Sequence, residues 1–310
     1  MMNGESQIAA TPSDEGRHSS FIIPHSSFGL LLDPPADGAW NMAVDETLLE
    51  AAADEGRCTL RFYQWAEPTL SLGYFQAYSA RAGHEASRRS AAVRRTSGGG
   101  AILHDFDVTY SLAVPDGHPL AANRLRTYRV VHDALIEVLA DAGIEASLFS
   151  PGTPGLGRGN HSPAPRWGGS CTAAPSPAAA EGGQCNCPPN AIGDCRHSEP
   201  FLCFQRRAAG DVLVKGEKIA GSAQRRRRGA VLQHGSVLLA RSPAAPELDG
   251  LKELAAETIL VEEFIEAWLE KLAAALVVQW RRGSLGDADR RRATELATEK
   301  YASPAWTKAR

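Results

Sequence analysis

The sequence predicts an α+β domain in which a mainly antiparallel, mixed sheet is flanked by helices. Two features of the element order support this. Several strand-like segments come before the long helical segment at 123–146, and strongly helical segments close the chain. This order favours α+β over alternating β-α units. We find no internal repeat of roughly 20–50 residues, the period of solenoid and propeller folds.

Composition sets the broad class. A chain of 310 residues has room for one large domain or two small ones. A formal charge of −3 exerts no overall pull toward nucleic acid or an anionic membrane, and neither is expected as a partner. The longest apolar runs fall well short of the roughly 18–20 residues that cross a bilayer.

The first 29 residues are expected to form a disordered extension. Their apolar stretches are short and follow acidic residues, unlike a secretory signal peptide. We therefore expect a cytoplasmic protein, in which cysteines are thiols or metal ligands rather than disulfides.

Folded sequence is expected to begin near Leu30. The segment at 40–56 has a helical pattern, with Asn41 as its N-cap and Gly56 at its end. Strands are predicted at 58–65 and 68–75, and on both sides of the glycine-rich turn within 91–105. At 107–114 apolar residues alternate with smaller or polar ones, which indicates a strand with one buried face.

A helix is predicted at 123–146, because Leu125, Tyr128, Val131 and Leu135 recur at three- and four-residue steps. Gly143 is its expected stop. Residues 151–199 then lose all periodicity and are crowded with Pro, Gly, Ala, Ser and Cys. An ordered loop of that length is unusual, so this segment is interpreted as a flexible insertion.

The last third of the chain returns to regular patterns. A hairpin is predicted at 211–223 with the two-residue turn Gly216-Glu217, and a further strand at 229–239. An amphipathic helix is predicted at 261–280 and a more polar helix at 287–303.

The segment RRTSGGGAILHD, at 94–105, is the most informative short motif. Gly98, Gly99 and Gly100 allow close approach of the main chain to a ligand, with N–H groups aimed at an anion or a carbonyl. Arg95 and His104 add polar groups nearby. A mobile hairpin with surface charges is the alternative. The spacing of a P-loop is absent.

Four segments together resemble the lipoate/octanoate protein ligase and transferase superfamily, which is related in fold to biotin protein ligases. They are RRTSGGGAILHD, GEKIAGSAQRRRRGAVLQHGS, GAWNMAVDETLL and ATELATEKYASPAW, and their order also fits. The resemblance implies a biotin/lipoate protein ligase-like catalytic domain over residues 30–310, interrupted by the insertion at 151–199.

Within that superfamily the chain is similar to the LipM type of octanoyltransferase, which places a Cys-Phe pair shortly before KIAGSAQ. Here the pair is Cys203-Phe204. The resemblance implies an octanoyl group taken from octanoyl-acyl carrier protein and held on Cys203 as a thioester. A lysine of a lipoyl domain or of the glycine-cleavage H protein would then receive it, with no metal or other cofactor.

The same resemblance gives Lys218 as the second catalytic residue. As a cation it favours the Cys203 thiolate, and as a neutral amine it accepts a proton. Burial against apolar neighbours such as Ile219 is expected to lower its pKa. The expected substrate-binding residues are Arg95, Ser97, Gly98, Gly99, Gly100, Ala101, His104, Gly221, Ser222, Ala223, His234 and Gly235.

Alternatives remain open at this level. Cys203 can instead be an inert packing thiol and Lys218 a solvated lysine near a turn. His104 and His234 can line the site or simply satisfy core hydrogen bonds. The run Arg225–Arg228 is either a solvated turn or a docking surface for acidic carriers.

At the level of the whole protein, an ATP-dependent lipoate or octanoate ligase and a lipoyl amidotransferase share the fold. A non-catalytic acyl- or metal-binding protein would use the cysteine-rich insertion. Its Cys171, Cys185, Cys187 and Cys195, with His161 and His197, lack the spacing of paired zinc knuckles. Cys58 is expected in the core.

Overall fold

The computed structural model describes residues 26–151 and 200–310. Almost all of the predicted extension (1–29) and of the predicted insertion (151–199) lies outside the described residues. Residues 26–29, which were counted in the predicted extension, belong to strand β1 (Ser26–Leu32). This strand pairs with one neighbour from Ser26 onward and with a second from Gly29 onward.

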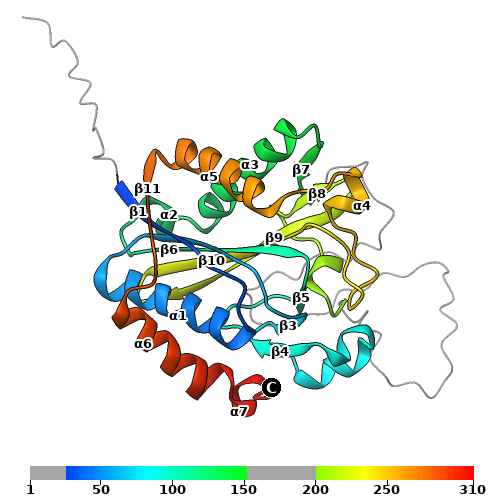
Figure 1. The fold of residues 1–310 in the computed structure, drawn as a ribbon, viewed down its shortest axis with the longest axis horizontal. Coiled ribbons are helices and arrows are strands. Elements are labelled where there is room, and N and C mark those ends of the chain that lie inside the picture. Colours follow the sequence, from blue (N-terminus) through cyan, green and yellow to red (C-terminus); the bar gives the residue numbers. More distant parts are fainter. Residues whose placement is uncertain (1–25, 152–199) are drawn as a thin grey trace, which may run out of the picture.

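The described residues form one eight-stranded mixed sheet (Figure 1). Its first three strands run parallel: β11 (Val278–Gly283), β1, and β2 (Thr59–Tyr63). The others pair antiparallel in the order β6 (Asp107–Val114), β10 (Ala230–Leu238), β9 (Glu217–Arg227), β8 (Val212–Val214) and β7 (Ala146–Leu148). The predicted mixed, mainly antiparallel sheet is confirmed.

A second, three-stranded sheet carries the glycine-rich turn. Its central strand β3 (Thr69–Leu72) lies between β4 (Ala91–Arg94) and β5 (Ile102–His104). Strand β4 is parallel to β3, whereas β5 is antiparallel to it. The strands flanking the turn are therefore not a hairpin, because β3 separates them.

Helices cover both faces of the large sheet (Figure 1). Helices α3 (Arg124–Asp141) and α5 (Val261–Leu276) pack on one face, and α1 (Gly38–Glu55) and α6 (Asp287–Leu296) on the other. Shorter elements complete the described part of the chain: α2 (Pro119–Ala122), α4 (Leu251–Ala255), α7 (Pro304–Thr307), the 3-10 turns η1 (Tyr78–Gly83), η2 (Ala86–Arg89) and η3 (Cys203–Gln205), and a π-helical turn η4 (Ala297–Tyr301).

This two-sided covering corrects the interpretation of 107–114. All eight residues of β6 are buried, although one exposed face was predicted. The residues that face α1 are small or polar rather than exposed. Ser111 and Thr109 are less than 4 % exposed. Small size on a buried face produced the same alternation as polarity on a solvated one.

Several helix ends differ from the prediction, among them those of α1 and α5. The N-cap of α1 is Asp37, whose carboxylate accepts from the Trp40 amide at 2.8 Å, and Asn41 lies buried inside the helix. The Asn41 side chain bonds the carbonyl of Gln64 and so ties α1 to the end of β2. Helix α5 ends at Leu276, four residues early, because the next apolar residues form the edge strand β11.

A helix predicted at 123–146 is present as α3, with Val131 and Leu135 in the core, but it ends at Asp141 and Ala146 already belongs to strand β7. Leu125, expected on its apolar face, is 65 % exposed. No helix among residues 26–151 and 200–310 combines the length and apolarity needed to cross a bilayer.

The predicted hairpin at 211–223 is confirmed, with its turn shifted by one residue. Val214 pairs with Glu217, so the two turn residues are Lys215 and Gly216 rather than Gly216 and Glu217. Both have positive φ, at 50° and 84°, as a tight hairpin between twisted strands requires. This turn fixes the register that places Lys218 opposite Leu213.

Replacing Gly216 by alanine therefore tests the turn. A Cβ at a positive φ costs about 1–2 kcal/mol, so Gly216→Ala should lower the unfolding midpoint temperature by several degrees, as measured by calorimetry. Gly83→Ala is the matched control, because Gly83 has open space around it and an ordinary φ. Equal midpoints for the two variants would contradict the assigned turn.

Candidate active site

Cys203 and Lys218 lie side by side. The Lys218 Nζ is 3.7 Å from the Cys203 Sγ and 3.4 Å from the Cys203 carbonyl oxygen. The two residues come from different elements, η3 and β9. The thiol of Cys203 is partly exposed, whereas Lys218 is 6 % exposed. The sequence-based pairing of these residues is thus a spatial fact, while their catalytic roles remain predictions.

The glycine-rich turn positions Cys203. The Cys203 amide donates to the Ala101 carbonyl at 2.7 Å, and the Ala101 amide donates to the Phe201 carbonyl at 3.1 Å. A Cβ on Gly100 would lie 3.0 Å from both the Cα and the amide nitrogen of Cys203. Gly100 was expected to give a ligand close access to the backbone. Instead, the absence of a side chain at Gly100 allows the segment that carries Cys203 to pack closely against it.

Lys218 is held as a buried cation. Its Nζ is 2.8 Å from the Asp211 Oδ2 and 5.5 Å from the centre of the Phe204 ring. Burial alone would lower the pKa of Lys218, but the negative charges of the Cys203 thiolate and of Asp211 outweigh burial and raise it. The expected lowering is therefore wrong, because the sequence did not reveal Asp211 as a partner.

Arg95 supports the glycine-rich turn from inside. Its guanidinium donates to the carbonyls of Ser71 (2.8 Å), Gly98 (2.9 Å) and Gly100 (2.6 Å). Burial lowers the pKa of Arg95 to about 10. These bonds turn the carbonyls of the loop toward Arg95. In the described part of the chain, the amides of Gly98, Gly99 and Gly100 donate to no protein acceptor.

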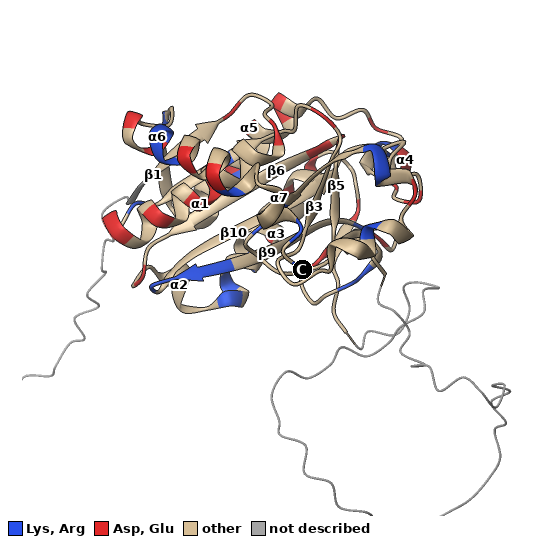
Figure 2. Cartoon of the chain, turned by 90° about the horizontal axis from the view of Figure 1, so that it is seen from below, with Lys and Arg blue, Asp and Glu red and all other residues tan. Residues whose placement is uncertain are grey.

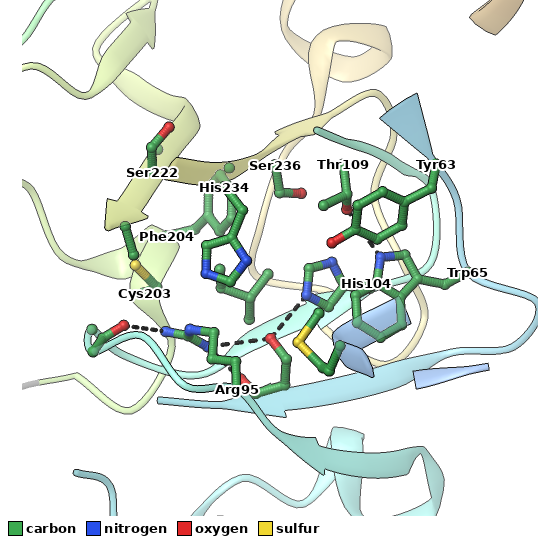
Figure 3. Close-up of a pocket in the computed structure, with 18 residues that line it drawn as sticks. Tyr63, Trp65, Arg95, His104, Thr109, Cys203, Phe204, Ser222, His234 and Ser236 are labelled. Atoms are coloured by element: carbon green, nitrogen blue, oxygen red, sulfur yellow. Dashed lines mark hydrogen bonds between the residues drawn. The ribbon is translucent and has the colours of Figure 1, made fainter. Parts of the chain in front are cut away.

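A pocket opens beside Cys203 and extends between the two sheets (Figure 3). Cys203 and Phe204 lie toward one end, with Tyr63, Trp65 and Thr109 toward the other. Apolar groups dominate the lining, which comprises Met42, Tyr63, Trp65, Ser71, Arg95, Gly98, Gly99, Ile102, His104, Thr109, Cys203, Phe204, Gly221, Ser222, Ala223, His234, Gly235 and Ser236.

His104 lines this pocket and also satisfies buried hydrogen bonds. Its Nδ1 is 2.8 Å from the Asp107 carboxylate and its Nε2 is 2.9 Å from the Ser71 hydroxyl. The ring stacks on Trp65 with centroids 3.9 Å apart. The two roles that the sequence left as alternatives therefore coexist.

His234 follows the same pattern on β10. Its Nδ1 lies 3.0 Å from the Asp45 carboxylate, and its Nε2 contacts the Ser97 hydroxyl. Burial would raise the pKa of Asp45, but its hydrogen bond to His234 and the charge of Arg61 outweigh burial and lower it. Both nitrogens of each pocket histidine are thus occupied by the protein.

Most of the predicted substrate-binding residues line the pocket: Arg95, Gly98, Gly99, His104, Gly221, Ser222, Ala223, His234 and Gly235. Ser97, Gly100 and Ala101 lie behind this lining. They support His234 and the Cys203 segment instead of facing the pocket. Lys218 also lies behind the lining, in contact with Cys203.

Sequence reasoning missed the carboxylates that orient the site. Asp211, Asp45 and Asp107 are each buried and pair with Lys218, His234 and His104. Only Asp107 has a local signal, since it follows His104 by three residues. Asp45 lies inside a helix and Asp211 precedes a short strand, where nothing in the sequence separates them from surface carboxylates.

The basic run Arg225–Arg228 divides into two pairs. Arg227 and Arg228 form ion pairs with Glu50 (2.9 Å) and Asp54 (2.5 Å). Arg225 and Arg226 are exposed and pair with no carboxylate in the described part of the chain.

Cys58 is half-buried against the core, as expected, and burial raises its pKa to about 11. The remaining cysteines and the proposed zinc ligands of the insertion lie outside the described residues.

Comparison with known proteins agrees with this geometry. Residues 37–248 match the model of the lipoyl protein ligase A/B catalytic domain. The chain is 32 % identical to octanoyltransferase LipM of Kyrpidia tusciae, over 89 % of this chain and 97 % of that protein. It is 31 % identical to octanoyltransferase LipM of Geobacillus kaustophilus, over 88 % and 94 %.

Solved structures share the fold. A lipoate-protein ligase A bound with ATP superimposes with a TM-score of 0.62 at 18 % identity, covering 91 % of this chain and 99 % of that one. A chain from the structure of a bipartite lipoate protein ligase and its E2 lipoyl domain from Thermoplasma acidophilum gives 0.59 at 19 % identity, covering 92 % and 97 %. The predicted ligase-like fold is confirmed, and the chain belongs to the lipoyl protein ligase A/B catalytic domain family, within which it is similar over most of its length to the octanoyltransferases LipM.

Proposed function

We propose that this protein is an octanoyl-[acyl carrier protein]:protein N-octanoyltransferase that works through a thioester on Cys203. The observation that supports it best is the Lys218 Nζ, 3.7 Å from the Cys203 Sγ beside an apolar pocket. An ammonium at that distance stabilises the thiolate, which is the nucleophilic form of cysteine.

The pocket suits an unbranched acyl chain. Its polar side chains already have protein partners: His104 and His234 use both ring nitrogens, and the Trp65 Nε1 donates to the Thr109 hydroxyl at 2.9 Å. The surface left for a ligand is therefore largely apolar, and moving an octanoyl tail from water into it is favourable.

In the first half-reaction the Cys203 thiolate attacks the carbonyl carbon of the donor thioester. The tetrahedral intermediate collapses, the carbon–sulfur bond to the carrier breaks, and the departing thiolate takes a proton from the Lys218 ammonium. The amides of Gly98, Gly99 and Gly100 donate to no acceptor among the described residues, and Gly100 packs against the Cys203 backbone, so this turn offers suitable donors to the transient oxyanion.

In the second half-reaction the amine of the acceptor lysine attacks the Cys203 thioester. It forms the amide, its surplus proton passes to the neutral Lys218, and Cys203 leaves as thiolate. The thiolate is one of the two charges that raise the pKa of Lys218. Acylation removes that charge, so Lys218 exists as a neutral base most readily when a base is needed.

The proposed donor is octanoyl-acyl carrier protein, and the proposed acceptors are a lipoyl domain and the glycine-cleavage H protein. In the T. acidophilum system the structural relative is a lipoate protein ligase with an E2 lipoyl domain. We place the reaction in the cytoplasm, since Cys203 must stay a reduced thiol.

The surface next to the pocket suits an acidic carrier. Arg226 lies beside α2 and the start of α3, where its guanidinium donates to the Ala121 carbonyl at 2.8 Å. Arg225 points to the opposite face of β9 and lies over the Tyr74 ring. The exposed arginines of α3 also lack carboxylate partners among the described residues. Figure 2 shows basic residues gathered at the end of β9, beside α2. The exposed Leu125 lies among them. We call this the arginine surface: Arg124, Arg126, Arg129 and Arg226.

The arginine surface adjoins the chemistry through α3. The Tyr128 hydroxyl, two residues beyond Arg126, donates to the Ser222 carbonyl at 3.1 Å, and Ser222 lines the pocket. A carrier bound at these arginines would thus be close to the acyl-binding site. Complementary charge of this kind chiefly raises the association rate.

Mass spectrometry tests the thioester. Purified protein incubated with octanoyl-acyl carrier protein should gain an octanoyl adduct on Cys203 that hydroxylamine removes. Cys203→Ala should lose the adduct and the transfer to a lipoyl domain, whereas Cys58→Ala should keep both. Transfer from free octanoate and ATP, independent of Cys203, would establish the ligase alternative and overturn the proposal.

Replacing Asp211 by asparagine tests the acid–base role of Lys218. Without the carboxylate the pKa of Lys218 falls, so the ammonium is lost at lower pH. The alkaline limb of the pH profile for Cys203 acylation should move to lower pH, and the second half-reaction should slow more than the first. Asp141→Asn, which breaks the exposed pair with Lys271, is the control. An unmoved alkaline limb would exclude this role for Asp211.

Charge reversal tests the arginine surface. Arg126→Glu with Arg226→Glu should raise the KM for octanoyl-acyl carrier protein by roughly tenfold at low salt, and the effect should shrink as salt screens it. The rate with a small octanoyl thioester that lacks the protein carrier should stay the same. Arg291→Glu on the exposed face of α6 is the control. An equal loss of activity with octanoyl-acyl carrier protein and with the small thioester would indicate damage to the Cys203 site and would contradict a docking role for the arginine surface.

A further inference from the structure

A buried chain of hydrogen bonds runs from β9 and β10 through the pocket wall to the loop before β8. The Gln224 Nε2 donates to the Gln233 Oε1 (2.8 Å), and the Gln233 Nε2 donates to the Tyr110 hydroxyl (2.7 Å). The Tyr110 hydroxyl lies 2.6 Å from the Ser222 hydroxyl. The chain continues through His132, which the proposed reaction does not yet use.

His132 connects Ser222 to the loop that carries Asp211. Its Nε2 is 2.7 Å from the Ser222 hydroxyl, and its Nδ1 is 2.6 Å from the Gly210 carbonyl oxygen. The imidazole is 1 % exposed. Gly210 directly precedes Asp211, whose carboxylate binds Lys218. A histidine on α3 thereby reaches the Cys203–Lys218 pair through one peptide unit.

The two ends of the chain fix the direction of every bond. A carbonyl oxygen only accepts, so the Gly210 contact requires a proton on the His132 Nδ1. At the other end, the Gln233 Nε2 also contacts the Thr127 carbonyl at 3.4 Å, which marks it as the donor nitrogen. With a neutral imidazole, Tyr110 donates to Ser222, Ser222 donates to the His132 Nε2, and each proton has an acceptor.

A second proton on His132 would break this order. The Nε2 would then donate to Ser222, and Ser222 would have to donate to the Tyr110 oxygen. The Tyr110 proton would lose its acceptor among the described residues, and a buried polar group without a partner is costly. Burial also lowers the pKa of His132, in agreement with a neutral ring.

We propose that His132 is a positioning residue which, as a neutral imidazole, holds the Gly210–Asp211 peptide so that Asp211 stays paired with Lys218 beside Cys203. The proposal rests on the proposed thioester chemistry for its role in the reaction. The bond to Gly210 sets where the Asp211 main chain lies. The Ala208 amide, which donates to the Asp211 Oδ2 at 2.7 Å, then orients its carboxylate.

Two substitutions at His132 separate positioning from simple stability. In His132→Gln the amide supplies one donor and one acceptor, as the neutral imidazole does, and it cannot take up a proton. In His132→Leu both are lost. Ser222→Ala breaks the same chain from the opposite side. His84→Gln, outside the site, is the matched control.

The readout is the rate at which iodoacetamide alkylates Cys203 in folded protein near neutral pH, located by peptide mass spectrometry. This rate reports the thiolate without requiring octanoyl transfer, so it can fail separately from the proposed function. His132→Leu should slow alkylation by about tenfold, toward the rate of Lys218→Met, and Ser222→Ala should fall between. His132→Gln and His84→Gln should stay within about twofold of the unchanged protein.

The proposal is overturned if folded His132→Leu is alkylated at the unchanged rate, because His132 would then serve only the stability of the fold. It is equally overturned if Cys203 in His132→Gln is alkylated as slowly as in His132→Leu, since loss of the hydrogen bonds of His132 would then not explain the slower alkylation.

A pH comparison adds an independent readout. As pH falls through the histidine range, the unfolded chain takes up a proton that the folded His132 refuses, so acid should destabilise the unchanged protein more than His132→Gln. Unfolding midpoints at pH about 7.5 and about 5.5, on either side of the ordinary value near 6.5, measure the difference. If the unfolding midpoints of the unchanged protein and of His132→Gln fall equally between these two pH values, His132 is not neutral in the folded protein. Ionisable groups packed around the ring are Asp211, Lys218, Tyr110, Tyr128 and Asp133.

Discussion

The buried ammonium of Lys218 is the constraint on which this site is built. A cation with 6 % exposure is tolerated only where anions and hydrogen-bond acceptors replace water. Asp211, the Cys203 carbonyl and the Cys203 sulfur supply them from two separate segments. A Cβ on Gly221 would lie 2.6 Å from the Lys218 Cε, so the lysine also needs a glycine beside it. Any loss of these neighbours leaves a charge in the protein interior.

The same constraint explains why the glycine-rich turn and the Cys203 segment must meet. The turn is shaped from within by Arg95, whose guanidinium binds the carbonyls of Gly98 and Gly100, and the amides of these glycines donate to no acceptor among the described residues. Gly100 then packs directly on the Cys203 backbone. One small loop thus positions the thiol, presents amide donors and lines one side of the pocket beside Cys203. Sequence position hides this, because about a hundred residues separate the two segments.

How much of this could be read from the sequence depends on the range of each interaction. The hairpin that carries Lys218 was predictable, because alternating residues and a glycine turn are local signals, although the turn lay one residue earlier than predicted. The family motifs identified Cys203 and Lys218. Nothing local marked His132, since its importance arises from contacts with segments far away in the chain. Asp211 lies only seven residues before Lys218, but the alternation of residues in the hairpin does not reveal that its carboxylate meets the ammonium. The error in the Lys218 pKa has the same origin: burial was foreseeable, the partner carboxylate was not.

The charges of the site suggest how one lysine can serve both half-reactions. The Lys218 ammonium lies between the Asp211 carboxylate and the Cys203 sulfur, and the negative charges of the carboxylate and of a Cys203 thiolate both favour keeping the proton on Lys218. Once Cys203 is acylated and Lys218 has given up its proton, Asp211 is left as a buried anion without a cation. That state strongly favours reprotonation of Lys218. The incoming amine can supply a proton to Lys218 only after it has attacked the thioester. Completing the transfer therefore restores the cation beside the buried Asp211 carboxylate and removes the electrostatic cost of the acyl-enzyme. A dry, apolar pocket helps, because it keeps water from delivering that proton first.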